Sequence, residues 1–152
     1  MAHEFAQKAV WQGGRDGHGA LAVGGIDVPL SIPVQLKGPG AGSNPEELML
    51  SALAACFSMT LGLIAVRAQP AVQRIETEIH GTVDLVRQPR PNLKFLEIRF
   101  SPHLWLAADQ PEPSADALLK LCQQAEDGCF ITQTVKAGVG QIVLDPPVVH
   151  RG

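Results

Sequence analysis

The sequence predicts an α+β fold in which antiparallel strands pack with one long buried helix and a second, shorter helix. Runs rich in Val, Ile and Thr, with alternating apolar residues, stand before and after one long uncharged segment. Gly and Pro clusters separate these runs at short intervals. The length of 152 residues and the 45% apolar composition suit a single domain, which we expect to cover residues 1–152.

The amino-terminal part predicts a hairpin followed by an edge strand. Two short runs, residues 5–11 and 20–23, lie on either side of a Gly-rich turn. A further strand is expected over residues 26–35, but its two prolines, Pro29 and Pro33, confine it to a sheet edge or interrupt it. A Gly-rich loop follows over residues 38–42.

The long helix is expected to begin at Pro45. Asn44 is a favoured N-cap residue, proline is favoured at the first helical position, and Glu47 stands where it can complete a capping box. The pattern predicts that this helix runs to about Ala68 and stops before Pro70.

Residues 48–66 form a stretch of 19 residues without a charge, about the length that spans a bilayer. The stretch contains serine, threonine and glycine, follows two glutamates directly, and lies between segments with soluble alternating patterns. We therefore interpret it as a helix in the centre of a globular domain or at a subunit interface, and we expect no membrane partner.

The carboxy-terminal half predicts two long antiparallel strands, a second helix and a closing strand. Ser114 is expected to cap this helix and Gly128 to end it, and Leu118, Leu119 and Cys122 share one of its faces. The predicted ranges are 72–86 and 93–100 for the strands, 115–125 for the helix, 130–136 for a short segment and 139–144 for the closing strand.

Composition excludes several classes of function. Lys and Arg number 12 against 15 Asp and Glu, and no basic block is present, so we expect no nucleic-acid partner. The amino terminus lacks the pattern of a signal peptide, which makes the cytoplasm the expected compartment. Three cysteines are too few for a disulfide scaffold, and the five histidines show no paired spacing that indicates a metal site.

Three motifs carry a resemblance to a known family. They are residues 42–48 (GSNPEEL) followed by 54–59 (AACFSM), residues 128–132 (GCFIT) and the loop 13–17 (GGRDG). Together they resemble the family of osmotically inducible protein C and the organic hydroperoxide resistance proteins (OsmC/Ohr). The first motif is specific, the second less so, and the order of strands and helices also agrees. The resemblance implies the fold of that family and a thiol peroxidase that acts on organic hydroperoxides.

The resemblance also implies roles for particular residues. Cys56 would be the peroxidatic thiol, Cys129 the resolving thiol that forms a disulfide with it, and Arg15 with Glu46 the polar pair that activates Cys56. No bound cofactor is implied, and the disulfide would be reopened by an external dithiol such as a lipoylated protein. Three apolar neighbours of the two cysteines are expected to contact the tail of an organic peroxide, namely Phe57, Met59 and Phe130.

Physical chemistry makes these roles reasonable. The thiolate is the nucleophile, whereas a free thiol is mostly protonated at neutral pH. Cys56 lies about three turns inside its helix, too far from the positive end of the helix dipole, so a cation such as Arg15 is expected to supply the stabilisation. Glu46 precedes Cys56 by ten residues, about 15 Å along one helix. The sequence therefore predicts an intertwined homodimer with sites at its interface, unless the helix is broken.

Several alternatives remain open at the level of the sequence. Cys122 is interpreted as a core residue, but it is a rival partner for Cys56. After Cys129 the family commonly has proline, a small aliphatic residue and serine, where this chain has Phe130, Ile131 and Thr132. Arg15 and Glu46 also fit plain roles as a turn residue and a helix-start carboxylate. The alternative functions are a ligand-binding or stress-related protein of the same fold without peroxide turnover and, more weakly, a cysteine hydrolase. The motifs do not separate the OsmC branch from the Ohr branch.

Overall fold

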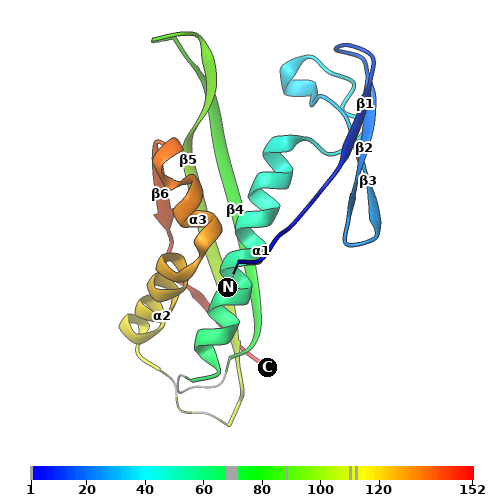
Figure 1. The fold of residues 1–152 in the computed structure, drawn as a ribbon. Coiled ribbons are helices and arrows are strands. Elements are labelled where there is room, and N and C mark those ends of the chain that lie inside the picture. Colours follow the sequence, from blue (N-terminus) through cyan, green and yellow to red (C-terminus); the bar gives the residue numbers. More distant parts are fainter. Residues whose placement is uncertain (1, 68–71, 88, 110, 112) are drawn as a thin grey trace. The chain divides into compact units, whose positions relative to one another are not determined.

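The computed structural model describes residues 2–67, 72–87, 89–109, 111 and 113–152 (Figure 1). The chain separates into two compact units, Met1–Met49 and Leu50–Gly152. Each unit has its own sheet, and the boundary between them falls within the first turns of the long helix. We describe the units in turn, and the single domain over residues 1–152 stays a prediction.

The first unit contains a three-stranded antiparallel sheet in the order β1-β2-β3. Its strands are β1 (Ala9–Gln12), β2 (His18–Val23) and β3 (Ile26–Leu30), and a 3-10 turn, η1 (Val34–Leu36), follows. The predicted hairpin is confirmed, although β1 begins later than expected. The third strand ends before Pro33, and Pro29 is tolerated because β3 lies at the sheet edge.

The long helix, α1 (Pro45–Ala65), begins where the sequence predicts. The side-chain Oδ1 of Asn44 accepts a hydrogen bond from the backbone N–H of Glu47 at 2.9 Å. The Glu47 carboxylate accepts a hydrogen bond from the Ser43 hydroxyl at 3.1 Å, so the second half of a capping box is replaced by this contact. The helix ends at Ala65, and the predicted end at about Ala68, like Pro70, lies outside the described residues.

The second unit is built on a mixed sheet. Two long strands, β4 (Val72–Val86) and β5 (Asn92–Leu106), pair antiparallel as expected. The sequence predicts one closing strand, but the structure has two, β6 (Gln141–Leu144) and β7 (Val148–Arg151), and both pair parallel to β5. The α+β class is therefore confirmed, while these two strands depart from purely antiparallel pairing.

Strand β5 is six residues longer than its predicted end at Phe100, because Pro102 is accommodated inside it. The Phe100 carbonyl accepts a hydrogen bond from the Asp145 N–H at 2.9 Å, so it points toward β6. Pro102, two residues on, directs its nitrogen to the same side. Its position falls between the end of β6 and the beginning of β7, where a missing N–H costs no ladder hydrogen bond.

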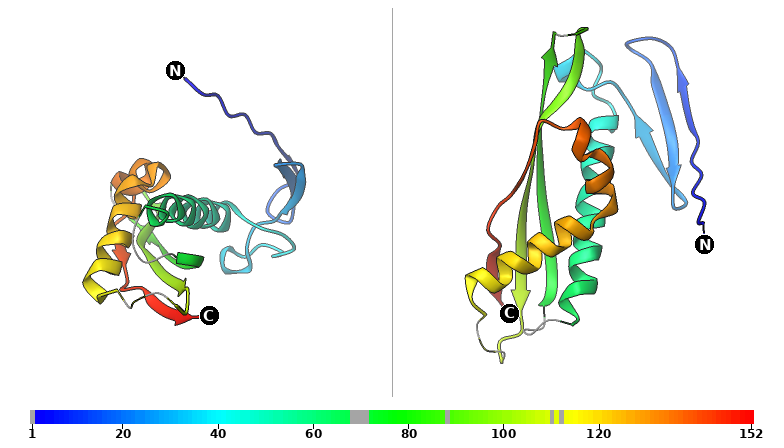
Figure 2. Two further views of the ribbon diagram at one scale, coloured as in Figure 1. Left: turned by 90° about the horizontal axis from the view of Figure 1, so that it is seen from below. Right: turned by 60° about the vertical axis from the view of Figure 1, so that its left-hand side comes forward.

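Two helices cover one face of this sheet together with α1 (Figures 1 and 2). They are α2 (Ala115–Gly128) and α3 (Phe130–Val135), and a 3-10 turn, η2 (Lys136–Gly138), follows. The Ser114 hydroxyl accepts a hydrogen bond from the Ala117 N–H at 3.2 Å, which confirms the predicted cap. Gly128 ends α2, as predicted.

Alternation along β5 explains how the core of the second unit forms. Its inward positions are buried, and on α1 the buried positions recur at helical spacing, which joins one face of the helix to the sheet. The Phe57 ring lies 5.2 Å from the Phe100 ring, centroid to centroid. The inward residues are Ile98, Phe100, Pro102, Leu104 and Leu106 from β5 and Leu53, Phe57, Leu61 and Ala65 from α1.

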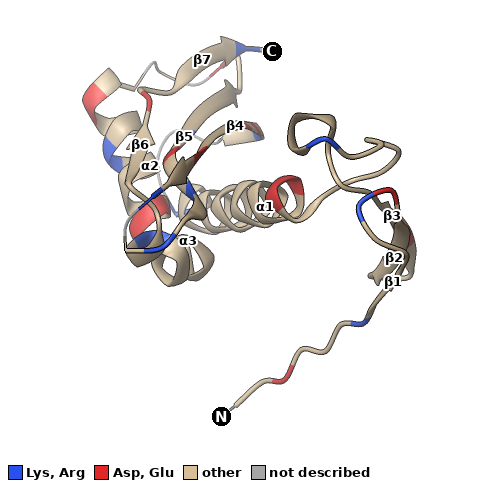
Figure 3. Cartoon of the chain, turned by 90° about the horizontal axis from the view of Figure 1, so that it is seen from above, with Lys and Arg blue, Asp and Glu red and all other residues tan. Residues whose placement is uncertain are grey.

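Helix α1 is long and apolar enough to cross a bilayer by length and composition, and its charges are confined to its first turn (Figure 3). Its buried face nevertheless belongs to the core just described. The Ser58 and Thr77 hydroxyls are also hydrogen-bonded at 2.7 Å, which ties the helix to β4. These contacts are typical of the core helix of a globular unit.

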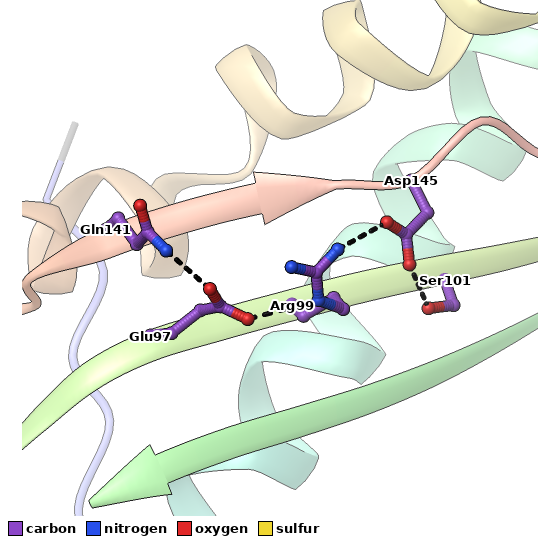
Figure 4. Close-up of polar contacts among 5 residues, drawn as sticks. All are labelled: Glu97, Arg99, Ser101, Gln141 and Asp145. Atoms are coloured by element: carbon purple, nitrogen blue, oxygen red, sulfur yellow. Dashed lines mark hydrogen bonds and ion pairs between the residues drawn. The ribbon is translucent and has the colours of Figure 1, made fainter.

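The opposite face of the sheet is polar. Arg99 forms ion pairs with Glu97 and Asp145, at 3.0 and 2.7 Å, and the Ser101 hydroxyl donates to Asp145 at 2.7 Å (Figure 4). Asp145 follows β6, so this network ties the connection between β6 and β7 to β5. Further along β5, the ring nitrogens of His103 and His150 lie 3.0 Å apart and join β5 to β7.

Candidate active site

Cys56 lies in the middle of α1, in the second unit. It follows the buried Leu53 by one helical turn and precedes the buried Phe57, and its own side chain is half-buried. Cys56 therefore stands at the border between the core face of the helix and its exposed face. This border position leaves the sulfur accessible while the helix backbone around it is fixed by core packing.

Cys129 lies at the junction of α2 and α3 and is fully buried. Its backbone is extended, with φ −75° and ψ 99°, so it separates two helices that would otherwise be continuous. The Cys129 N–H donates to the Glu126 carbonyl at 3.2 Å, and the Cys129 carbonyl accepts from the Gln133 N–H at 3.0 Å. The backbone of this one residue therefore contributes a hydrogen bond at the end of α2 and another at the start of α3.

The structure brings the two thiols close enough to interact, since the side chain of Cys56 acts directly on the pKa of Cys129. The Thr132 hydroxyl also donates a hydrogen bond to the Cys129 sulfur, at 3.1 Å. Burial raises the pKa of the Cys129 thiol, and the hydrogen bond with Cys56 raises it further, whereas the side chain and backbone of Thr132 act in the lowering direction.

Gly128 explains how the junction reaches α1. A Cβ on Gly128 would lie 3.2 Å from the Cγ2 methyl of Thr60, one turn beyond Cys56 on α1. This is tighter than ordinary van der Waals contact, so a larger residue would press the junction away from the helix. The absence of a side chain therefore allows α3 to lie beside α1 (Figures 1 and 2).

Cys122 has a different environment. It is fully buried on the core face of α2, with Leu118, Leu121 and Ala125 at helical spacing around it. Burial alone raises the pKa of the Cys122 thiol to about 11. All three cysteines are free thiols, and the packing of Cys122 agrees with its interpretation as a core residue.

Arg15 and Glu46 both belong to the first unit. Arg15 stands in the turn between β1 and β2, where its guanidinium donates to the Leu36 carbonyl at 2.8 Å. Glu46 lines an apolar cavity of about 340 Å³, to which Leu36 and Trp11 also contribute. One carboxylate oxygen of Glu46 is buried without a hydrogen-bond partner among the described residues. The ion pairs among the described residues do not include one between Arg15 and Glu46. The pairing of these two side chains at Cys56 stays a prediction.

The three residues expected to contact substrate are placed differently from one another. Phe57 is fully buried against Phe100, so its side chain packs in the core and has no exposed surface that a peroxide could contact. Met59 and Phe130 are 71% and 67% exposed. The sequence reasoning missed Thr132, whose signal was its place three residues after Cys129, where the family has serine.

In the part of the chain that the structure describes, no group of three or more His, Cys, Asp or Glu residues has the geometry to hold a metal ion.

Comparison with known proteins identifies the family. The model of the OsmC-like protein family matches residues 38–141, which include both cysteines of the thiol pair. The chain belongs to the OsmC-like family. An uncharacterised protein of Bacillus subtilis, YmaD, is 30% identical over 137 residues, which cover 90% of this chain and 89% of that protein.

Other OsmC-like relatives have names that refer to hydroperoxides. An organic hydroperoxide resistance protein-like 1 of Staphylococcus saprophyticus is 28% identical over 149 residues and covers 98% of this chain and 99% of its own. The crystal structure of an organic hydroperoxide resistance protein OsmC from Legionella pneumophila superposes with a TM-score of 0.74 at 19% identity, and covers 98% of this chain and all of that chain. These matches confirm the OsmC/Ohr fold.

Proposed function

We propose that this protein is a cysteine-based peroxidase that reduces organic hydroperoxides. The observation that carries the proposal is the contact between the thiols of Cys56 and Cys129, which come from two different helices. Relatives named for organic hydroperoxide resistance support the class of substrate. Two thiols in contact, one half-buried and one fully buried, are the arrangement required for a sulfenate followed by a disulfide.

The reaction has two steps. The Cys56 thiolate attacks the terminal oxygen of the hydroperoxide, the O–O bond breaks, and the alkoxide takes up a proton to leave as an alcohol. Cys56 is then a sulfenic acid. The Cys129 sulfur attacks the Cys56 sulfur, the S–S bond forms, the S–O bond breaks, and hydroxide leaves as water after protonation. A disulfide between residues 56 and 129 remains.

An external dithiol is proposed to close the cycle. Two thiols of one reductant return two electrons to the disulfide by thiol–disulfide exchange, and the reductant leaves as its own disulfide. A lipoylated protein is the proposed partner. Cys56, the half-buried member of the pair, is the sulfur that such a reductant can attack first, because Cys129 is fully buried.

Activation of Cys56 is proposed to depend on Arg15 and Glu46 and on a homodimer. Helix α1 is continuous from Pro45 to Ala65, so the alternative of a broken helix is removed. Ten helical residues separate Glu46 from Cys56 by about 15 Å. A Glu46 carboxylate that acts on Cys56 must then come from a second copy of the chain.

The exposed face of α1 supports association of two copies. Three large apolar side chains on or just after this helix, Met59, Leu63 and Val66, are 71%, 74% and 86% exposed. They recur with the helical period on the face opposite the core. Association through this face buries apolar surface that is otherwise in water.

Thiol counting tests the proposal. The reduced protein is mixed with one equivalent of cumene hydroperoxide, and the mass and the linked peptides are measured. In the wild type we expect the mass to fall by two hydrogens and the linked peptides to contain a disulfide between Cys56 and Cys129. In Cys129→Ser we expect stable addition of oxygen to Cys56. In Cys56→Ser we expect no oxidation product. The variant Cys122→Ala is the matched control and should behave as the wild type.

The opposite result favours the other function of this fold. If Cys56 remains a thiol after exposure to excess peroxide, the protein is a binding or stress-related member of the family without turnover. An acyl group found on Cys56 after incubation with activated esters would instead indicate a hydrolase.

A further inference from the structure

Thr132 has an unusual position for a helical threonine. It lies in the first turns of α3, is fully buried, and directs its hydroxyl at the Cys129 sulfur, 3.1 Å away. Its backbone also contributes a hydrogen bond to that sulfur. Thr134, two residues further along α3, shows the ordinary alternative, because its hydroxyl is exposed and donates to the Phe130 carbonyl at 2.8 Å. The hydroxyl of Thr132 is therefore used for the thiol and not for the helix.

We propose that Thr132 is a positioning residue that prepares Cys129 for its attack on Cys56, by donating hydrogen bonds that hold its sulfur and stabilise it as the anion. This inference rests on the proposed peroxidase function. It adds a third residue to the thiol pair and gives that residue a role in the second step alone.

The comparison with Cys122 shows what Thr132 contributes. Both cysteines are fully buried, and burial alone raises the pKa of Cys122 to about 11. Burial also raises the pKa of Cys129, but two hydrogen bonds from Thr132 oppose this effect. A buried thiol without such donors is a poor nucleophile at neutral pH, because the charged form is not stabilised.

The order of the two steps follows from the opposing effects on Cys129. Cys56 acts to keep Cys129 protonated, while Thr132 acts to ionise it. When Cys56 becomes a sulfenic acid, its negative charge is lost, so the charge repulsion that helps to keep Cys129 protonated disappears. The hydrogen bonds from Thr132 remain. The first oxidation therefore makes Cys129 easier to ionise at the moment when its anion is needed to form the disulfide.

Three variants test the role of Thr132. Thr132→Val removes the hydroxyl at nearly constant volume, Thr132→Ser restores it, and Thr134→Val makes the same change at the exposed position of the same helix. Each reduced protein is mixed rapidly with cumene hydroperoxide across a range of pH, and mass spectrometry of quenched samples follows the Cys56 sulfenate and the disulfide separately. Thermal unfolding of each variant verifies that the fold is kept.

We expect Thr132→Val to form the sulfenate within about twofold of the wild-type rate and to close the disulfide about tenfold more slowly, with the pH midpoint of closure shifted upward. Thr132→Ser should recover to within about threefold, and Thr134→Val should match the wild type. The inference is overturned if Thr132→Val closes its disulfide at the wild-type rate and with the wild-type pH midpoint.

A second measurement separates this inference from the proposed function. In a protein that carries Cys56→Ser and Cys122→Ala, Cys129 is the single thiol, and its ionisation is followed by the ultraviolet absorbance of the thiolate without any peroxide. Addition of Thr132→Val should move this titration to higher pH. If the wild type fails to react with peroxide while this shift is present, the peroxidase proposal fails and the effect of Thr132 on Cys129 stands. If the shift is absent, the inference fails.

Discussion

At the scale of single residues, the three cysteines show how environment decides the chemistry of a thiol. Cys56 is half-buried on α1, Cys129 is buried but in contact with Cys56 and Thr132, and Cys122 is buried among apolar side chains. Burial raises the pKa of the Cys122 thiol to about 11. The sequence offers all three as candidates for oxidation. Cys129 interacts with Cys56 and Thr132, whereas burial alone acts on the Cys122 thiol.

Replacement of Cys122 by alanine is expected to leave peroxide reduction within about twofold of the wild type, because the residue packs in the core and burial alone acts on its thiol. Alkaline stability should change. The pKa of the Cys122 thiol is about 9 in the unfolded chain and about 11 in the folded protein. The unfolded chain therefore ionises first, and the folded state loses stability as pH rises from about 9 toward about 11. Urea unfolding across this range should show a smaller loss in Cys122→Ala. Loss of turnover in this variant, with the fold intact, would assign Cys122 to the reaction.

At the scale of secondary-structure elements, the junction between α2 and α3 decides the geometry of the thiol pair. Gly128→Ala should press the junction away from α1, because the added methyl meets the Thr60 side chain at 3.2 Å. We expect disulfide closure to slow by about threefold or more while sulfenate formation is kept. Gly138→Ala is the matched control, since an added Cβ there has open space.

A double-mutant cycle strengthens this experiment. Thr60→Ser removes the methyl that the new side chain would meet, so Gly128→Ala combined with Thr60→Ser should recover most of the closure rate. Equal rates for the single and double variants would show that the contact between Gly128 and Thr60 does not control the approach of Cys129 to Cys56.

The connection between β6 and β7 gives a second element-scale prediction. The Ser101 hydroxyl, followed by Arg99, holds the pKa of the Asp145 carboxyl below its usual range. Because the pKa of Asp145 is lower in the folded protein than in the unfolded chain, its carboxylate stabilises the folded state at pH values above the pKa of the unfolded chain. This stabilisation is lost as pH falls through the pKa of the folded protein. Asp145→Asn should therefore flatten the dependence of the unfolding free energy on pH below about pH 4. Because the carboxyl is largely exposed, the effect should be small and should shrink in high salt. An unchanged slope in urea titrations would contradict the role of this network.

At the scale of the whole molecule, the exposed apolar face of α1 predicts a homodimer. Leu63→Glu places a charge on this face and should convert the dimer to a monomer with at least a tenfold loss of peroxide reduction, measured by light scattering and by turnover. Gln123→Glu, which adds the same charge on the exposed side of α2, should change neither quantity. A wild-type protein that is monomeric at working concentration and fully active would exclude the proposed site at a subunit interface.

Much of the fold could be predicted because the signals were local. Asn44 and Ser114 mark helix starts through hydrogen bonds to the next turn, and Pro45 does so through its fixed φ. Gly128 marks a helix end. The extension of β5 and the strand β7 could not be predicted in this way. From the local sequence alone, Pro102 is expected to end the strand. In the structure its missing N–H falls between the end of β6 and the start of β7, where no ladder hydrogen bond is lost.

The sequence by itself determined the class of fold, the family resemblance, the start of α1, and the cysteines on which the chemistry depends. Only the tertiary structure decided which of Cys122 and Cys129 meets Cys56, that Phe57 belongs to the core, and that Thr132 donates to Cys129. The physical reason is the distance along the chain over which each kind of interaction acts. Caps, turns and alternation act within a few residues, whereas the contact of Cys56 with Cys129 depends on how α1 and the junction of α2 and α3 pack on one sheet.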